Sequence, residues 1–278
     1  MFMWLAKAAC SARSRQVQWD NQNGMTDMGF GGKVAIVTGG ARGLGFAIAE
    51  ALAAAGAKVL VGDVSGAEDA VHQLSSTGSD VKGCFADVTS EDSVRAMVEA
   101  AQASFGRVDI LVNNAAIAAD MAMTRFEDIS PKAFLRMMEV NALGTFLCCQ
   151  AVSPIMRAQR YGRIINMASG TAFRGMPFVS HYVASKGAVM TLTRSLAHEL
   201  GEDEITVNAV SPGYTITGPN MANESYMQKV RPEVLKLRAI KRDAYADDVV
   251  GAVLFLASDG AKFVTGQILA ADGGAVYH

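Results

Sequence analysis

Two side chains in the second half of the chain have the spacing of an acid–base pair. Tyr182 and Lys186 are four residues apart in the stretch "HYVASKGA" (181–188), where a polar loop gives way to an alanine-rich run. Four residues are slightly more than one helical turn, so the phenol and the ammonium lie on one face of a helix. A nearby positive charge lowers the pKa of a phenol toward the range in which it can exchange protons. The same spacing also occurs in ordinary surface contacts, so other residues must show whether this pair is catalytic.

Ser169 adds a hydroxyl to this pair. It precedes Tyr182 by 13 residues and ends the apolar run "YGRIINMAS" (161–169), which predicts a strand. A hydroxyl at the carboxyl end of a parallel strand can hydrogen-bond a substrate oxygen and stabilise developing charge. A hydrolase nucleophile is disfavoured, because "NMASGTAF" lacks the G-x-S-x-G elbow and no carboxylate–histidine pair is evident. Consecutive helical residues diverge, so His181 is expected to border a substrate cleft at most.

A glycine-rich turn, "TGGARGLG" (38–45), separates a strand-like run from a helical one. Such a turn lets backbone amides approach a pyrophosphate, and the following helix points its positive end at the same anion. The spacing of Gly39, Gly43 and Gly45 departs from G-x-G-x-x-G, and tight packing of strand on helix is the alternative explanation. Its place in a strand–turn–helix unit favours a dinucleotide site.

Asp63 ends the next strand-like run, 20 residues beyond Gly43. A carboxylate there can accept hydrogen bonds from both ribose hydroxyls of an adenosine and would repel a 2′-phosphate. The alternative is a turn aspartate that caps nearby amides. Arg42 could neutralise a 2′-phosphate, but Val64 supplies no second cation. The residues therefore favour NAD over NADP.

Strand-like and helical segments alternate along the chain, and the strands are too apolar to expose a face. This pattern predicts an α/β fold, a single doubly wound Rossmann-type domain over 29–278 with a parallel seven-stranded sheet and helices on both faces. The predicted strands are 33–38, 58–63, 81–88, 108–115, 161–169, 204–213 and 266–274, and the predicted helices are 45–57, 67–78, 90–106, 131–159, 181–201, 219–237 and 246–258.

Composition excludes several classes of function. The net charge is −2 and the pI about 6.1, which argues against a nucleic-acid surface. No apolar run reaches the length of a membrane span. The four cysteines and four histidines show no metal-ligand spacing, and idle thiols suit a reducing, cytoplasmic compartment. Residues 1–28 differ from the rest and predict a disordered extension or an upstream start codon, with a transit peptide as the alternative.

Several short motifs that are typical of one protein family follow one another along the chain. Over 32–274 the chain resembles the classical branch of the short-chain dehydrogenase/reductase family. The family usually has glycine where Ala116 stands, a small departure that narrows the space beside the nicotinamide. The resemblance is carried by "TGGARGLG" (38–45), "ADV" (86–88), "NNAA" (113–116), Asn141, Ser169, "YVASK" (182–186), "SPG" (211–213) and "DGG" (272–274).

The resemblance implies roles for individual residues. Thr217 would contact the nicotinamide carboxamide, and Asn141 would open its helix locally and hold a water that leads protons away from Lys186. The implied catalytic tetrad is Asn141, Ser169, Tyr182 and Lys186. The implied cofactor contacts are Gly39, Arg42, Gly43 and Leu44 at the phosphates, Asp63 at the ribose, Asp87 and Val88 at the adenine, Asn114 and Ala115 at the crossing, and Pro212, Gly213, Thr215, Thr217, Tyr182 and Lys186 at the nicotinamide end.

The activity so implied is NAD(H)-dependent interconversion of a secondary alcohol and a ketone, with Tyr182 as general acid/base. The alternatives are a cofactor-sensing binding protein, an NADP(H)-dependent carbonyl reductase, and enoyl reduction or epimerisation. A sensor needs no base, so the presence of Ser169, Tyr182 and Lys186 argues against it. The Y-x-x-x-K spacing after a serine suits carbonyl chemistry better than enoyl reduction.

Substrate choice is expected to lie in 171–181 and in a substrate loop over about 214–242. Their mixed aromatic, methionine and polar residues predict a mid-sized, partly apolar substrate. Arg174 either meets an anionic group or faces water. The resemblance also implies a homotetramer formed through the helices predicted at 131–159 and 181–200. Four side chains either line the pocket or pack its lid: Met176, Phe178, Met221 and Tyr226.

Overall fold

The computed structural model describes residues 29–277 apart from 77, 119–120 and 219–223, and describes only the backbone of 224–230. The predicted extension 1–28, together with Cys10 and His278, lies outside the described residues. Seven parallel strands form one sheet in the order β3-β2-β1-β4-β5-β6-β9. The order reverses between β1 and β4, which is the topological switch of a doubly wound fold. The strands are β1 (Val34–Thr38), β2 (Lys58–Asp63), β3 (Val81–Phe85), β4 (Ile110–Asn113), β5 (Gly162–Met167), β6 (Ile205–Pro212) and β9 (Ile268–Ala271).

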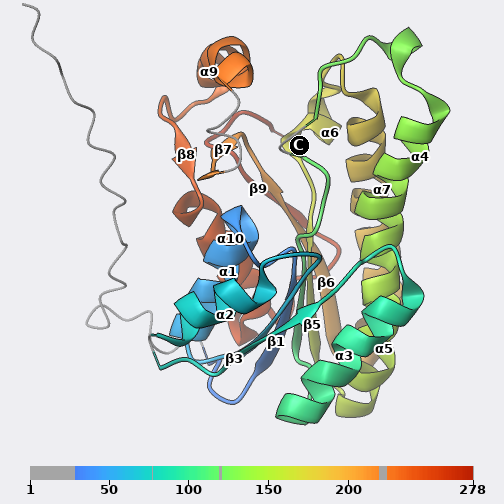
Figure 1. Ribbon diagram of the computed structural model, residues 1–278, viewed down its shortest axis with the longest axis vertical. Coiled ribbons are helices and arrows are strands. Elements are labelled where there is room, and N and C mark those ends of the chain that lie inside the picture. Colours follow the sequence, from blue (N-terminus) through green and yellow to red (C-terminus); the bar gives the residue numbers. More distant parts are fainter. Residues whose placement is uncertain (1–28, 77, 119–120, 219–223, 278) are drawn as a thin grey trace, which may run out of the picture.

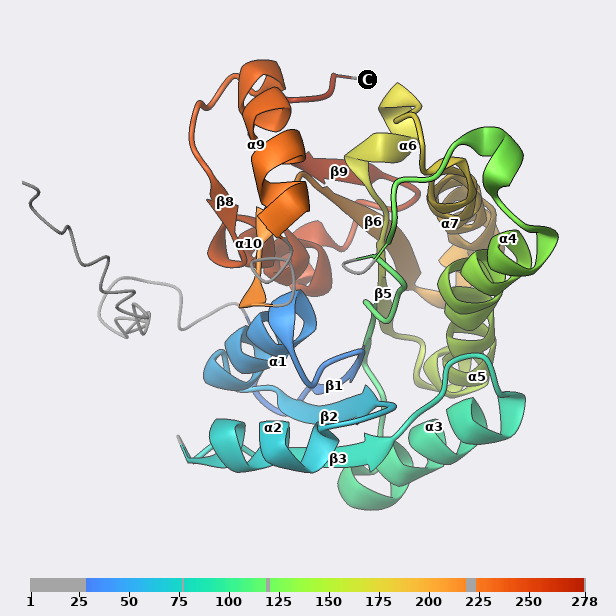
Figure 2. The same ribbon diagram turned by 45° about the horizontal axis from the view of Figure 1, so that its top comes forward.

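Helices cover both faces of the sheet, as predicted. One face carries α1 (Gly43–Ala54), α2 (Ala67–Ser75) and α10 (Asp247–Ala257), and the other carries α3 (Glu91–Phe105), α5 (Gly144–Gln159) and α7 (Ser180–Leu200) (Figures 1 and 2). Single turns of 3₁₀ helix lie at Phe126–Asp128, Gly201–Asp203 and Asp259–Ala261. The fold class predicted from the alternation of segments is confirmed.

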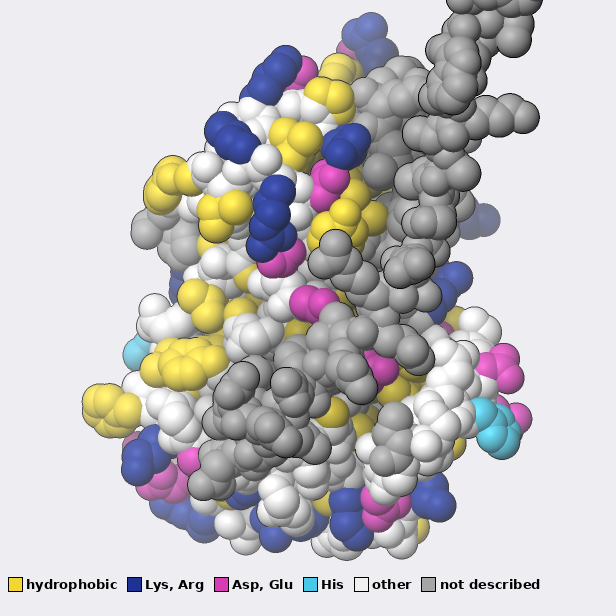
Figure 3. All heavy atoms as spheres, turned by 90° about the vertical axis from the view of Figure 1, so that its left-hand side faces the viewer, with side chains coloured by type: hydrophobic (Ala, Val, Ile, Leu, Met, Phe, Trp, Pro, Cys, Tyr) yellow, Lys and Arg dark blue, Asp and Glu magenta, His cyan; other side chains and the backbone are white. Residues whose placement is uncertain are grey.

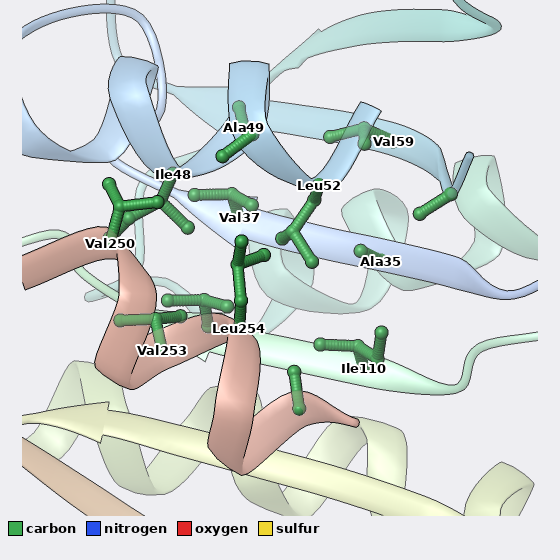
Figure 4. Packing of buried hydrophobic residues seen from close by; sticks show 14 of the residues in the cluster. Ala35, Val37, Ile48, Ala49, Leu52, Val59, Ile110, Val250, Val253 and Leu254 are labelled. Carbon is green, nitrogen blue, oxygen red and sulfur yellow. The ribbon is translucent and has the colours of Figure 1, made fainter. Parts of the chain in front are cut away.

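Two helices meet over β1 to form the larger part of the core. In Figure 4, α1 and α10 project their apolar side chains onto the central strands β1 and β4. Every residue of β1 is buried, which explains its unbroken apolar run. The core side chains labelled in Figure 4 are Ala35, Val37, Ile48, Ala49, Leu52, Val59, Ile110, Val250, Val253 and Leu254.

The long helix predicted over 131–159 is interrupted. It consists of α4 (Pro131–Met138), a π-helical turn over Glu139–Leu143, and α5. The π-turn contains Asn141, so the local opening expected at that residue is present. Elsewhere, the predicted loop after Ser169 contains the short helix α6 (Gly170–Arg174), and the described part of the helix predicted at 219–237 is α9 (Glu224–Leu237).

The short pair β7 (Thr215–Ile216) and β8 (Ala244–Tyr245) joins the start and end of the predicted substrate loop. Helices α6 and α9 both lie beyond the carboxyl ends of the central strands, at the top of Figure 1. This is the edge at which ligands bind in open α/β sheets. Among the described helices, none has the length and apolar character needed to cross a membrane.

Candidate active site

A cleft of about 500 Å³ opens at the carboxyl edge of the sheet. Its walls come from the segments that follow β1, β2, β3, β4, β5 and β6, together with α6, α7 and α9. Asn141 alone of the predicted residues lies behind the cleft wall. The structure brings the other predicted residues together along it: Gly39, Arg42, Gly43, Leu44, Asp63, Asp87, Val88, Asn114, Ala115, Ser169, Tyr182, Lys186, Pro212, Gly213, Thr215 and Thr217.

The turn after β1 leaves no room for a side chain at Gly39 or Gly45. A Cβ on Gly39 would lie 2.8 Å from the Ala115 Cα, and a Cβ on Gly45 would lie 2.1 Å from the Gly39 carbonyl oxygen. Gly39 and Gly43 also have positive φ angles of 62° and 59°. The Asn114 amide donates to the carbonyl oxygens of Thr38 (3.0 Å) and Gly39 (2.9 Å), which fixes the turn against β4. The turn is therefore a backbone cradle.

The first turn of α1 faces this cradle. Its N-cap residue, Arg42, makes no side-chain capping hydrogen bond, so the cap leaves the orphan amides of the helix start to another acceptor. An anion at a helix N-terminus next to a glycine turn is the usual arrangement for a bound pyrophosphate. The geometry of Gly39, Gly43 and Gly45 fits a dinucleotide.

Asp63 both caps amides and faces the cleft. Its carboxylate accepts hydrogen bonds from the backbone N–H of Ala41 (3.1 Å) and of Ser65 (3.2 Å). The two interpretations of Asp63 made from sequence are thus compatible. Val64 beside it is exposed, and so is Arg42, which also lines this wall.

Asp87 lies further along the same wall. Its carboxylate accepts from the Thr89 amide (2.9 Å) and the Thr89 hydroxyl (2.7 Å), and these bonds hold the pKa of Asp87 below its usual value. The neighbouring Val88 packs against Gly144, where an added Cβ would lie 2.7 Å from the valine side chain. This end of the cleft is therefore a rigid surface.

Ser169, Tyr182 and Lys186 meet at the middle of the cleft. Ser169 caps α6, and its hydroxyl accepts from the backbone N–H (3.3 Å) and hydroxyl (2.9 Å) of Thr171. The Tyr182 phenol lies near the Ser169 hydroxyl on the cleft wall, close enough for this hydroxyl to lower the pKa of the phenol. Lys186 is buried, its Nζ donates to the Met167 carbonyl oxygen (2.7 Å), and it lies 5.9 Å from the centroid of the Tyr182 ring.

The pKa of Tyr182 differs in direction from the expectation. Burial raises the pKa of the phenol, and the nearby Ser169 hydroxyl opposes that rise. Lys186 does not produce the expected lowering, because its ammonium is bound to Met167 and is itself desolvated, which lowers the pKa of Lys186 to about 8. The protein groups alone therefore keep the phenol protonated at neutral pH.

Asn141 ties α7 to the segment after β4. It is 1% exposed; its Oδ1 accepts from the Ile117 N–H (2.8 Å), and its Nδ2 donates to the Ile117 carbonyl (3.2 Å) and the Ser185 hydroxyl (3.0 Å). The π-turn aims this amide away from the helix axis and toward those partners. Its holding of a water on a proton path from Lys186 stays a prediction.

Two buried charged residues in the cleft wall were missed from sequence. Arg238, at the end of α9, is 2% exposed, and Asp272, just after β9, is 3% exposed. Asp272 accepts from the backbone N–H of Gly274 (2.9 Å) and Ala275 (3.1 Å). The "DGG" motif pointed to Asp272 without a role, and no local pattern marks Arg238.

The side chains expected near the substrate do not all line the cleft. Met176 and Arg174 line the cleft with Met121 and Val179, whereas Phe178 is half exposed and does not. Met221 and the side chain of Tyr226 lie outside the described residues. His181 is buried, and it is not part of the cleft wall.

The thiols lie apart from this chemistry. Burial raises the pKa of Cys148 and raises that of Cys149 to about 12, and partial burial raises that of Cys84. A thiol that keeps its proton is a poor nucleophile and a poor metal ligand. Over the part of the chain that the structure describes, no cluster of histidine, cysteine and carboxylate side chains could hold a metal ion.

Known proteins share both this sequence and this fold. The family model described as enoyl-(acyl carrier protein) reductase matches residues 39–276. The chain is 41% identical over 247 residues to a 3alpha-hydroxysteroid dehydrogenase of Mediterraneibacter gnavus (87% of this chain, 96% of the relative). It is 41% identical over 246 residues to a cis-4-hydroxycyclohexanecarboxylate dehydrogenase of Sinomonas cyclohexanicum (88% and 97%).

A solved structure agrees with these relatives. A candidate short-chain alcohol dehydrogenase from Sinorhizobium meliloti 1021 superposes with a TM-score of 0.84 at 33% identity, covering 89% of this chain and 98% of that one. The fold and the cleft define a nucleotide-binding oxidoreductase. The chain belongs to the short-chain dehydrogenase/reductase family, which uses a nicotinamide cofactor.

Proposed function

We propose that the protein is an NAD(H)-dependent dehydrogenase that interconverts a secondary alcohol and a ketone, with Tyr182 as general acid/base. One observation carries this proposal. The Ser169 hydroxyl, the Tyr182 phenol and the Lys186 ammonium lie together on one wall of the cleft, and the glycine-rich turn over 39–45 lines the same cleft. The described region 29–277 acts as one catalytic domain in this proposal.

The protein groups divide the work between them. Ser169 holds the substrate oxygen, and Tyr182 gives a proton to it during ketone reduction or takes one from it during alcohol oxidation. Lys186, held by the Met167 carbonyl, supplies positive charge beside the phenol. Asn141 fixes α7 through Ser185, one residue before Lys186. Pro212, Gly213, Thr215 and Thr217 would hold the nicotinamide end of the cofactor, which would supply or accept the hydride when bound.

Charge around the adenosine end supports NAD over NADP. Asp63 places a carboxylate on the cleft wall, and the exposed side chain next to it is Val64. A 2′-phosphate would meet this negative charge, whereas ribose hydroxyls can donate to it. Arg42 is an opposing cation beside the glycine-rich turn, and Arg136 lines the cleft near Asp87. The NADP(H)-dependent carbonyl reductase is the alternative that Arg42 keeps open.

The wall near Tyr182 supports a substrate with an apolar body and one anionic group. Met121, Met176 and Val179 provide apolar surface there. Arg174 ends the short helix that Ser169 begins, and it is exposed on the cleft wall. A carboxylate attached to a ring or chain would suit this pairing of apolar and cationic groups. Of the two relatives named above, one acts on a hydroxycyclohexanecarboxylate.

The proposal also covers how the protein assembles and where in the cell it is located. Apolar side chains are exposed along α4, the π-turn and α5, which supports a homotetramer formed through these helices and α7. The proposed location is the cytoplasm, where the free thiols Cys84, Cys148 and Cys149 remain reduced. The exposed apolar side chains are Phe134, Leu135, Leu143 and Phe146.

A screen of secondary alcohols with NAD⁺ tests the function. Carboxylated and neutral alcohols of matched size would be offered, and absorbance at 340 nm followed. We expect NADH to form with at least one alcohol, faster with NAD⁺ than with NADP⁺. Cofactor binding without turnover of any alcohol or ketone would instead favour the cofactor-sensing alternative.

A further inference from the structure

One arginine joins the two ends of the segment that forms a wall of the cleft. The Arg238 guanidinium donates from Nη1 to the Arg242 carbonyl oxygen (2.8 Å) and from Nη2 to the Tyr214 carbonyl oxygen. Tyr214 follows β6 and Arg242 precedes β8, so the two acceptors mark the start and end of the 214–242 segment. We call these two hydrogen bonds the Arg238 clasp.

Burial distinguishes Arg238 from the other basic side chains of this segment that the structure describes. Arg231, Lys236 and Arg242 are exposed and form ion pairs with neighbouring carboxylates, and Figure 3 shows such mixed charges on the upper part of this face. Arg238 is 2% exposed instead, and its burial lowers its pKa in spite of three nearby carboxylates, those of Asp243, Asp272 and Asp248. A buried guanidinium costs free energy unless its donors are satisfied.

Asp272 is the most buried of these three carboxylates. Its Oδ2 and the Nε of Arg238 both lack a hydrogen-bond partner among the described residues, so the two groups interact through their charges. A Cβ on Gly213 would lie 2.9 Å from Asp272 and 3.2 Å from Arg238 Nη2, and a Cβ on Gly170 would lie 3.8 Å from Asp272 Oδ2. Gly170 follows Ser169 directly. The charged pair thus lies between the catalytic hydroxyl and the base of the 214–242 segment.

We propose that Arg238 is a positioning residue, which fixes the base of the 214–242 segment and thereby sets substrate affinity, while Asp272 balances its charge. Arg238 lines the cleft, but both Nη groups are bound to backbone carbonyls, so in this proposal it acts through the segment it holds. The effect on substrate affinity rests on the proposed dehydrogenase function. The clasp itself does not.

Three variants separate geometry from charge. Arg238→Met removes both hydrogen bonds and the charge, Arg238→Lys keeps the charge but as a single ammonium that cannot bridge two carbonyls, and Arg238→Met with Asp272→Asn restores neutrality without the clasp. Lys236→Met is the matched control, because it removes an exposed cation from the same helix.

Hydrogen–deuterium exchange of the full-length protein is the first measurement. We expect peptides from 214–242 to exchange at least about tenfold faster in Arg238→Met and in the double variant, with the sheet unchanged. Arg238→Lys should be intermediate and Lys236→Met should match the wild type. If the double variant exchanges like the wild type, Arg238 only neutralises Asp272 and the proposal is wrong.

Steady-state kinetics are the second measurement. In the double variant we expect KM for the alcohol to rise about tenfold while kcat changes less than about threefold, because the chemical groups stay in place. An equal loss in kcat at unchanged KM would overturn a positioning role. Hydrogen exchange decides the clasp even where no alcohol is oxidised, so failure of the proposed reaction and failure of this inference are distinguishable.

Discussion

The two walls of the cleft are built by different means. The cofactor wall is backbone: the turn over 39–45 approaches β4 so closely that Gly39 and Gly45 have no space for a Cβ. The substrate wall depends on side chains, with Arg238 joining Tyr214 to Arg242. A wall packed this closely through its backbone has little freedom to change its geometry. A wall held by a single long side chain can change its shape without disturbing the sheet.

The largest expected effect lies where the two walls meet. Tyr182→Phe removes the only atom of the phenol that exchanges a proton, and we expect kcat to fall about 10³–10⁴-fold while NADH binding stays within about twofold. Turnover assays with cofactor titration measure both. Tyr245→Phe, at an exposed tyrosine of β8, is the control. An active Tyr182→Phe enzyme would refute the assignment of the acid/base.

Gly45→Ala tests the backbone wall. The new methyl would lie 2.1 Å from the Gly39 carbonyl and 2.4 Å from the Asn114 amide, so the turn must move. We expect cofactor affinity to drop about 100-fold, in line with an overpacking cost of about 3 kcal/mol. Fluorescence titration with NADH measures the affinity. Gly251→Ala in α10, where an added Cβ meets nothing, should bind normally. Normal binding by Gly45→Ala would mean that the cradle is adaptable.

Asp63→Ala keeps the backbone wall and removes its charge. We expect the preference for NAD⁺ over NADP⁺, measured as a ratio of kcat/KM values, to fall about 10- to 100-fold, since a hydrogen bond to a carboxylate contributes about 1.5–3 kcal/mol. Glu68→Ala, at an exposed acid of α2, is the control. An unchanged ratio would show that Asp63 serves only the Ala41 and Ser65 amides.

The pH dependence of the reaction rate tests Lys186, beside Tyr182, in another way. Burial lowers the pKa of Lys186 to about 8, so its positive charge is present below that pH and is lost as the pH rises through it. We expect the rate of ketone reduction to fall about tenfold for each pH unit above about 8. Lys186→Arg should move this fall to higher pH, because a guanidinium keeps its proton. A fall that stays near pH 8 in the variant would assign it to another group.

The smallest effect is expected on the substrate wall. Arg174→Met should raise KM for a carboxylated alcohol about fivefold and leave KM for its methyl ester unchanged, because an exposed ion pair contributes little. Arg95→Met on α3 is the control. Equal KM values for acid and ester in the wild type would mean that Arg174 faces water.

Features that depend on local spacing could be predicted from sequence. The order of strands and helices follows from buried apolar runs, and the cradle and the Tyr182–Lys186 pair follow from residue types at fixed intervals. The direction of the Tyr182 pKa could not be predicted, since it depends on how much protein surrounds the phenol and on the bond between Lys186 and Met167.

Other features depend on distant partners. The opening at Asn141 was expected only from the family resemblance, and its amide binds Ile117 and Ser185, 24 and 44 residues away along the chain. Arg238 lies just past the end of α9 and resembles the other arginines of the segment in sequence, and only the fold brings it to its acceptors at Tyr214 and Arg242. Sequence spacing carries no signal for either contact.

The Arg238 clasp also has a consequence for chain length. Its two acceptors and the adjoining β7–β8 pair close the 214–242 segment at its base. The entropy cost of loop closure grows slowly, by about 0.6 kcal/mol for each doubling of length. Residues added or removed between these anchor points would therefore barely strain the sheet. We therefore expect that the segment can be exchanged between related dehydrogenases at Tyr214 and Arg242, and such exchanges would test whether it sets the substrate range.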